Sequence, residues 1–246
     1  MCSVTFWPRP SGYLVGMNRD ERRVRVPGEP PRRYQDSGVA VVHPAEPTGG
    51  TWMSLNDRGV TLALINWYAI SERATEPMVS RGEVVRSVRS VTQFEQLSQG
   101  VVGLPLDRMN PFRLLAFLAE STAVWEGRWN RRRWEWLRHP WEAAQWQSSG
   151  HLEATAQEVR GGTFARHRND RDAGTVPWLR RLHGSHLPER GPFSICMHRP
   201  DAQTVSYTEA EVEESVATLR HSPTALCEGR PLTGVELERG KLRAES

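Results

Sequence analysis

Lysine is almost absent from this chain of 246 residues. The chain has 32 basic and 29 acidic residues, which give a net charge of +3, and every basic residue except Lys241 is an arginine. So small a charge over this length argues against electrostatic steering of an anionic partner. We therefore attribute the arginine bias to coding composition rather than to a nucleic-acid surface.

Cysteine is scarce as well, and long apolar runs are missing. Cys2, Cys196 and Cys227 are widely spaced and form no Cys-x-x-Cys pair, which argues against a disulfide framework. No segment approaches the ~18 consecutive apolar residues of a membrane span. The N-terminus also lacks the basic and apolar regions of a signal peptide. We expect a cytoplasmic protein without a membrane span.

The chain does have a cysteine directly after its first methionine. The small side chain of Cys2 favours removal of Met1, so we expect Cys2 to become the mature N-terminus. One residue would then carry both a thiol and a free α-amine, and the amine (pKa ~7.7–8.0) can act as base for the thiol (pKa ~8.5). Arg19 and Asp20 end the next expected strand. There Asp20 can bind the α-ammonium, and Arg19 can hold a thiolate or an anionic substrate group.

The apolar pattern predicts two blocks of β-strands with helices between them. Residues 80–99 have helical periodicity and two capping-box patterns, which predict two short helices. The polar region 150–190 is expected to hold loops and one or two helices. The expected strands are 2–7, 13–18, 39–43, 50–55, 60–66, 112–119, 122–128, 133–137, 193–198 and 204–208.

This order of elements is typical of a layered α+β sandwich. The sequence shows no internal repeat and no clear linker, so we expect one domain over residues 1–246. The polar segment 228–246 is expected to be a flexible tail.

Five features occur in one order along the chain: Met1-Cys2, Asn18-Arg19-Asp20-Glu21, Gly49-Gly50-Thr51-Trp52, Leu62-Ala63-Leu64-Ile65-Asn66-Trp67 and Ser80-Arg81-Gly82-Glu83. Together they resemble the Transport and Golgi organisation 2 family, also called the NRDE family, over roughly the first third of the sequence. That family looks related to the cysteine branch of the N-terminal-nucleophile hydrolases, which contains the bile-salt and penicillin V amidases. The resemblance implies a four-layer αββα sandwich of the N-terminal-nucleophile hydrolase type.

The same resemblance implies catalytic roles for four residues. Cys2 would be the nucleophile, Arg19 and Asp20 would support it, and Asn66 would stabilise the oxyanion. The branch also carries a second asparagine after the midpoint and a late arginine. The nearest residues here are Ser149 and Arg190. Because the loss of one oxyanion donor commonly costs ~10²–10³ in turnover, we expect weak hydrolysis.

The leading hypothesis is a hydrolase or acyltransferase that acts on a linear, non-peptide amide or thioester. Trp52 and Ser149 are the expected substrate-binding residues, although Trp52 also suits the core and Gly49-Gly50 suits a turn or a close backbone approach. The resembled family is associated with haem trafficking and with lipid and acyl-CoA metabolism. This gives the alternative of a non-catalytic carrier. The expected partner is a small acyl or hydrophobic ligand, with haem as one candidate, and not a nucleic acid.

Two further patterns offer weaker alternatives. Residues 127–136 interleave arginine and tryptophan, which could stack on bases, but a hairpin with Asn130 near its turn is favoured. Cys196, His198, His221 and Cys227 are sufficient in number for a metal site, although their spacing matches no standard zinc pattern. From the sequence we assign no cofactor and no metal ligand. Whether these four residues bind a metal is a question that the sequence leaves open.

Overall fold

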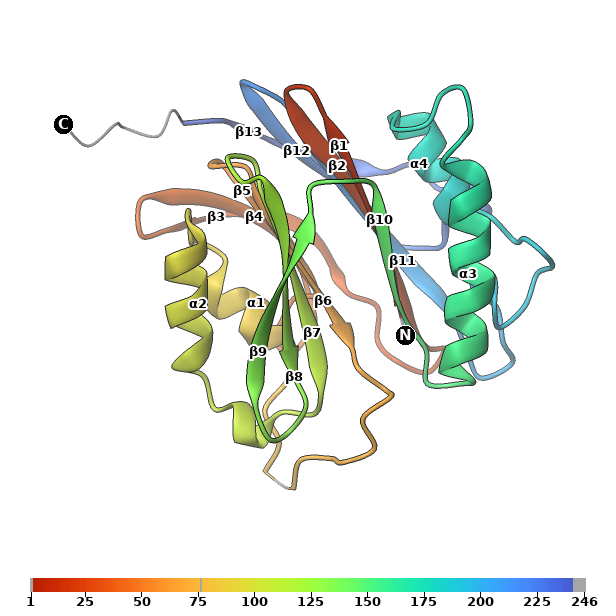
Figure 1. Ribbon diagram of the computed structural model, residues 1–246, viewed down its shortest axis with the longest axis horizontal. Coiled ribbons are helices and arrows are strands. Elements are labelled where there is room, and N and C mark those ends of the chain that lie inside the picture. The colour runs from red at the N-terminus through yellow and green to blue at the C-terminus, as the bar shows by residue number, and fades with distance from the viewer. Residues whose placement is uncertain (1, 76, 241–246) are drawn as a thin grey trace.

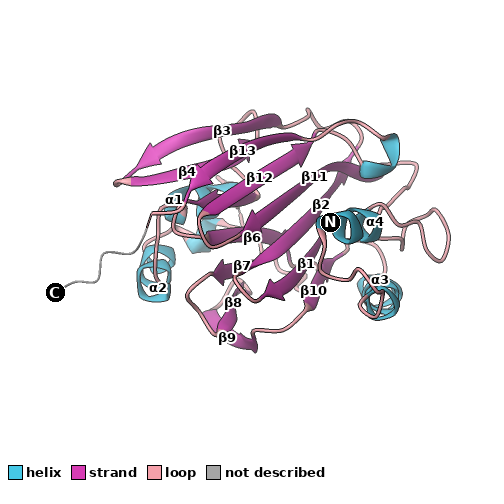
Figure 2. Ribbon diagram, turned by 90° about the horizontal axis from the view of Figure 1, so that it is seen from above, coloured by secondary structure: helices cyan, strands magenta, loops and turns pink. Residues whose placement is uncertain are grey.

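Two antiparallel β-sheets lie face to face in the computed structural model, which describes residues 2–75 and 77–240. Helices α1 (Gly82–Val88) and α2 (Phe94–Val102) cover the outer face of one sheet. Helices α3 (Glu153–His167) and α4 (Val176–His183) cover the outer face of the other. Figures 1 and 2 show these four layers from two directions. The expected αββα sandwich is confirmed.

The first sheet has six strands and contains the N-terminus. Its first strand is paired on both sides, so the residue that begins this strand is held by two neighbours. From edge to edge the strands are β10 (Ala144–Ser148), β1 (Cys2–Arg9), β2 (Gly12–Arg22), β11 (Ala202–Val212), β12 (Val216–Ser222) and β13 (Thr233–Glu238).

The second sheet has seven strands, whose spatial order follows the sequence. Its middle strand is almost continuously apolar, as expected for a strand that is covered on both faces. The strands are β3 (Glu29–Asp36), β4 (Val39–Ala45), β5 (Met53–Asn56), β6 (Val60–Asn66), β7 (Phe112–Leu118), β8 (Ala123–Trp129) and β9 (Trp134–Pro140).

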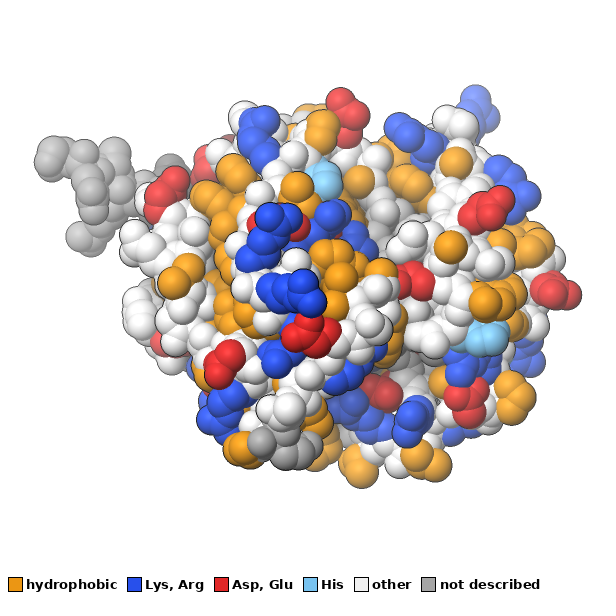
Figure 3. All heavy atoms as spheres, turned by 60° about the horizontal axis from the view of Figure 1, so that its bottom comes forward, with side chains coloured by type: hydrophobic (Ala, Val, Ile, Leu, Met, Phe, Trp, Pro, Cys, Tyr) orange, Lys and Arg blue, Asp and Glu red, His pale blue; other side chains and the backbone are white. Residues whose placement is uncertain are grey.

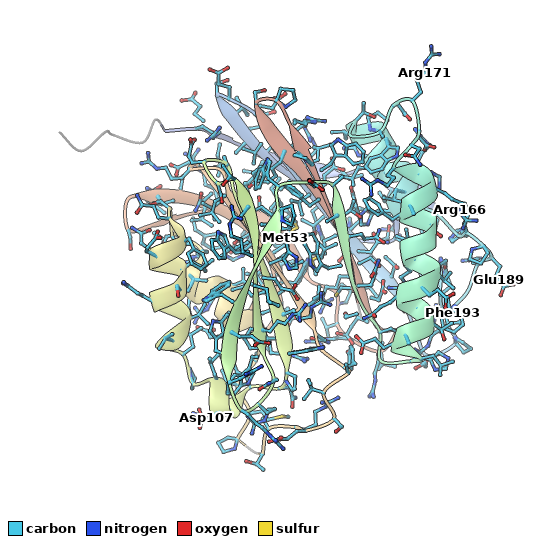
Figure 4. All side chains as sticks on the ribbon, in the orientation of Figure 1. Met53, Asp107, Arg166, Arg171, Glu189 and Phe193 are labelled. Atoms are coloured by element: carbon cyan, nitrogen blue, oxygen red, sulfur yellow. The ribbon has the colours of Figure 1, made fainter. Side chains whose placement is uncertain are left out.

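The alternation of side chains along β2 separates the apolar layers. Tyr13 and Met17 point between the sheets, whereas Leu14 points outward against α3 and α4. In the central layer Phe6 of β1 stacks on Phe117 of β7, with ring centroids 5.0 Å apart. Figure 4 shows Met53 in the middle of the molecule, in this same layer. Each such buried side chain contributes about 1.5–3 kcal/mol relative to an exposed one.

Two predicted segments differ from the structure. Residues 193–198, predicted as a strand, form turns in which only His198 makes an isolated bridge, because local hydrogen bonds take up the backbone. Residues 233–238 of the expected flexible tail form β13, which pairs with β12 and buries Leu237. Residues 241–246 of that tail lie outside the described residues.

The proline- and arginine-rich stretch around residue 30, for which no strand was predicted, forms β3. Pro30 and Pro31 are accommodated because β3 is an edge strand, where backbone N–H groups need no partner strand. None of the helices within residues 2–75 and 77–240 is long and apolar enough to cross a membrane.

A buried histidine joins α4 to the N-terminal hairpin. His183 is fully buried, and its Nδ1 donates to Oδ1 of Asn18 over 3.1 Å while its Nε2 accepts from the Thr5 hydroxyl over 3.0 Å. The Asn18 amide donates in turn to the carbonyls of His183 and Ile195. Burial lowers the pKa of His183 to about 3. The first residue of the Asn-Arg-Asp-Glu motif is therefore part of the packing between sheet and helix.

We expect this histidine to make folding acid-sensitive. The folded-state pKa lies below the ordinary value of 6.5, so as the pH falls the unfolded chain takes up a proton first. His183 should therefore reduce the unfolding free energy by roughly 1.4 kcal/mol per pH unit between about pH 6.5 and about 3. Urea denaturation of the wild type and of His183→Gln between pH ~7.5 and ~5 measures this slope. Equal slopes for the two proteins would contradict the assignment.

Candidate active site

Most of the predicted site residues meet where strands of the two sheets end. Cys2 begins β1 and is paired in register with Arg19 of β2, while Asn66 ends β6 in the facing sheet. Together with Asp20 and Trp52 they line one pocket of about 70 Å³. Cys2 itself is only 8% exposed.

Ser149 does not line this pocket. Its hydroxyl donates to the carbonyl of His151 over 2.7 Å and accepts from the His151 N–H over 3.2 Å. The neighbouring Gly150 packs so closely on Tyr68 that a Cβ on the glycine would lie 3.3 Å from the ring. The ring of Tyr68 thus lies beside the segment where the second asparagine was expected.

Arg19 points between the two sheets. Its guanidinium lies 2.7 Å from the Glu46 carboxylate and 4.6 Å from the centre of the Trp52 ring. Glu46 also receives a hydrogen bond from the more exposed Arg25 over 2.9 Å. These contacts fix Arg19 in the pocket wall beside Cys2.

Asp20 points the other way, towards α3, because successive residues of a strand face opposite sides. Its carboxylate accepts a hydrogen bond from the Thr204 hydroxyl over 2.7 Å and lies 3.3 Å from the guanidinium of Arg160. Arg160 is fully buried and also donates to the Ser3 hydroxyl over 3.0 Å. Asp20 therefore links β2, β11 and α3.

Arg160 was missed by the sequence interpretation, which named Arg190 as the nearest late arginine. Arg190 is exposed and lies 3.4 Å from Nδ1 of His198 instead. The available signal was helical periodicity, because Arg160 shares the buried face of α3 with Ala156 and Phe164.

The surroundings of Cys2 disfavour the thiolate form of its side chain. Burial raises the pKa of the Cys2 thiol, and the Asp20 carboxylate acts in the same direction. The backbone N–H of Asp20 and the Arg19 guanidinium oppose this shift. A thiol in this position needs a nearby base before it can act as a nucleophile.

Arg81 brings a third arginine to the pocket beside Arg19 and Arg25, and no role was predicted for it from the sequence. The predicted capping box at residues 80–83 does not form, since Arg81 is the N-cap of α1 and Glu83 pairs with Arg86. Arg81 instead lines the pocket and donates to the Pro111 carbonyl over 3.3 Å. Burial lowers the pKa of Arg81, and the nearby Tyr68 and Cys2 oppose that shift.

Two of the sequence motifs form a single backbone contact. The N–H of Thr51 donates to the Gly82 carbonyl over 3.1 Å. A Cβ on Gly82 would lie 2.9 Å from the Thr51 nitrogen and 3.0 Å from Cα of Gly50. Only glycine permits this approach, which brings the chain neighbours Trp52 and Arg81 to the same pocket.

Residues 127–136 form the favoured hairpin. Asn130 Oδ1 accepts hydrogen bonds from two backbone N–H groups of the turn between β8 and β9. Trp134 and Trp136 pack against Phe112 and Phe94 rather than facing solvent. Figure 3 shows that basic side chains on the lower face of the molecule are interrupted by acidic and hydrophobic ones. The tryptophans of this stretch are thus part of the hydrophobic packing.

Comparison with known proteins gives matches in structure alone. No family model matches the sequence, and no curated protein matches it. A mutant of the conjugated bile acid hydrolase from Clostridium perfringens superposes with a TM-score of 0.56 at 8% identity, over 96% of this chain and 92% of that one. The penicillin V acylase from Agrobacterium tumefaciens gives 0.56 at 10% identity, over 98% and 87%.

The chain has the N-terminal-nucleophile hydrolase fold. A second variant of the Clostridium hydrolase agrees, with a TM-score of 0.53 at 9% identity, over 97% of this chain and 98% of that one. The expected fold type is therefore confirmed, and the resemblance to the NRDE family stays a prediction from the sequence.

We expect Gly82→Ala to destabilise the protein by about 1–3 kcal/mol, because the new Cβ would collide with backbone atoms that cannot rotate away. Gly162→Ala is the matched control. A Cβ at that position of α3 meets nothing within 4 Å. Because alanine is more stable than glycine in a helix, this substitution should raise the free energy of unfolding by about 0.5–1 kcal/mol. Urea denaturation of both variants tests the contact, and a stable Gly82→Ala would rule it out.

Proposed function

We propose that the protein is an N-terminal cysteine hydrolase or acyltransferase that acts on a linear, non-peptide amide or thioester. The supporting observation is that Cys2, Arg19, Asp20 and Asn66 line one pocket in this fold. The order of motifs that resembles the NRDE family supports the same proposal. The two solved relatives are named as a bile acid hydrolase and a penicillin V acylase, so their named activities are of the same class.

In the proposed reaction, the α-amine of Cys2 takes the proton of its own thiol once Met1 has been removed. The thiolate attacks the substrate carbonyl, and the α-ammonium returns the proton to the leaving amine or thiol as the bond to it breaks. Water or another acceptor then attacks the acyl-cysteine and releases the acyl group. Asp20 orients the α-amine, and Arg19 steadies the thiolate or an anionic part of the substrate.

The oxyanion donors in this proposal are Asn66 and Tyr68. The Asn66 amide donates to the Tyr68 hydroxyl over 2.7 Å, which leaves its second N–H for the developing oxyanion. Because the Tyr68 oxygen accepts from Asn66, its own proton is free to be donated. We propose that Tyr68 supplies the second donor in place of the asparagine that the sequence lacks near Ser149.

The size of the pocket favours a narrow substrate. About 70 Å³ holds only a small group, whereas cavities for drug-sized ligands measure ~300–1,000 Å³. Its walls carry Arg19 and Arg81 as well as Glu46, so the entering group must tolerate a polar surface. These properties suit one end of a linear acyl compound better than a haem group, and they support the enzyme over the carrier.

Mass spectrometry of the intact protein tests the acyl-enzyme. We expect the mature chain to begin at Cys2 and to gain one acyl group during incubation with a panel of aryl acyl esters, acyl amides and acyl thioesters. A form with an N-terminal extension is the matched control, because it keeps the thiol and loses the free α-amine. Cys2→Ala should gain no acyl group. If the extended form reacts equally well, the intramolecular base is wrong; if haem binds tightly and no adduct forms, the carrier replaces the enzyme.

Substitution of the two proposed donors should reduce turnover while leaving the fold intact. We expect Asn66→Ala to lower kcat by ~10²–10³ and Tyr68→Phe by ~10-fold or more, with little change in melting temperature. Tyr34→Phe is the control, since the Tyr34 ring stacks on His43 away from the pocket. Equal activities of Tyr68→Phe and wild type would remove Tyr68 from the proposed site.

A further inference from the structure

We infer that His186, Cys196, His198 and Cys227 bind one zinc ion in a tetrahedral site that is separate from the proposed active-site pocket. The sequence offered His221 as a ligand and no metal was expected. The structure replaces His221 with His186. None of these four residues lines the pocket that contains Cys2.

The printed distances between four pairs of ligand atoms lie close to those that zinc requires, and only a small shift would complete the set. The two sulfur atoms are 3.5 Å apart, the His198 Nε2 atom lies 3.6 Å and 3.5 Å from them, and the two Nε2 atoms are 3.2 Å apart. All four donor atoms lie within 4.8 Å of one another. A tetrahedron with Zn–S ~2.3 Å and Zn–N ~2.0–2.1 Å requires separations of ~3.8 Å, ~3.6 Å and ~3.3 Å for S–S, S–N and N–N pairs.

The kinds of ligand select the metal. Two thiolates and two imidazoles in a tetrahedral arrangement are typical of zinc, and four protein ligands leave no open position for catalysis. The two thiolate charges balance the charge of the ion. Arg190 lies 3.4 Å from Nδ1 of His198, which carries the proton when Nε2 binds a metal, so this exposed arginine would turn away into solvent.

A disulfide explains the cluster less well. The sulfur atoms of Cys196 and Cys227 would need to approach to ~2.0 Å for a covalent bond. A disulfide would also not explain why the imidazoles of His186 and His198 lie beside these sulfur atoms. His221 is excluded as a fourth ligand by its own contacts. It shares a hydrogen bond of 3.0 Å with the Thr208 hydroxyl, and its ring packs beside Trp52.

The backbone around the cluster holds the ligands from separate parts of the chain. The Cys196 N–H donates to the Ser185 carbonyl, and the His198 N–H donates to the Gly191 carbonyl, each over 3.0 Å. Cys227 comes from the short helix η2 (Leu226–Glu228) after β12. Figure 4 labels Glu189 and Phe193 in the irregular loop beside α3 that carries the first three ligands. Long loops without regular structure are uncommon in compact domains, and a metal ion would stabilise this one.

The proposed zinc site is connected to Asp20 through hydrogen bonds of Met197 and Thr204. Between two of the ligands, the backbone N–H of Met197 donates to the Thr204 hydroxyl over 2.9 Å. That hydroxyl donates in turn to the Asp20 carboxylate over 2.7 Å. Zinc would therefore act as a positioning element that holds this segment, and with it Thr204 and Asp20, in place.

Metal analysis of the purified full-length protein tests the inference. We expect one zinc per chain, and replacement by Co²⁺ should give the visible bands of a tetrahedral ion together with a thiolate-to-cobalt charge-transfer band. This wild-type spectrum needs no variant to fold. Absence of both zinc and cobalt binding would overturn the site, and so would a Cys196–Cys227 disulfide in protein that binds neither metal.

Variants identify the ligands. Cys227→Ser removes an exposed thiol, and we expect it to weaken zinc binding by more than ~10-fold, since even substitutions outside the ligand shell cost that much. His151→Gln, at an exposed histidine, should bind zinc like the wild type. Cys2→Ser should also keep its zinc, which separates this test from the proposed acyl chemistry. Unchanged affinity of Cys227→Ser, or metal loss in Cys2→Ser, would contradict the assignment.

Discussion

The ion pair between Asp20 and Arg160 is the interaction on which the site region depends. Both side chains are almost completely buried, and each has further partners, Thr204 for the carboxylate and Ser3 for the guanidinium. The pair therefore joins α3 to β1, β2 and β11. Removing one partner of such a pair leaves a buried charge, which commonly costs about 3–5 kcal/mol. Asp20 is thus a structural residue in addition to any role at the α-amine.

The residues of the Asn-Arg-Asp-Glu motif divide between packing on one face of β2 and the pocket wall on the other. Asn18 and Asp20 point outward to the helices, where they bind His183 and Arg160, whereas Arg19 points inward to Glu46 and Trp52. A strand allows this because its side chains alternate between two faces. A short run of polar residues can in this way hold a helix layer on one face and a pocket wall on the other.

The sequence predicted what depends on local pattern. The apolar runs of β1 and β6 placed Cys2 and Asn66 at strand ends, whereas β2 continues past its predicted end to Arg22 and contains Arg19. The structure brings these three residues to one pocket. Prediction from the sequence failed where contacts with distant segments of the chain determine the structure. β3 and β13 are polar edge strands without a strong apolar alternation, and Arg160 shows its role only once α3 lies on the sheet.

The zinc ligands illustrate the same limit. His186 and His221 are equally plausible when only spacing is considered, because neither belongs to a standard motif. The folded chain decides between them, since β12 places His221 against Trp52, while the loop before Cys196 brings His186 to His198 and into one cluster with the two cysteines. Rules based on sequence spacing cannot detect a ligand set that is assembled from two separate segments, one of them an irregular loop.

The double pairing of β1 has a consequence for synthesis. Cys2 pairs locally with Arg19 but also with Ser148, and β2 pairs on its other side with β11, which is made later still. During synthesis the N-terminal hairpin therefore keeps both of its edges unpaired until most of the chain has been translated. We therefore expect Met1 to be removed in this interval, while β1 and β2 still lack β10 and β11 as partners.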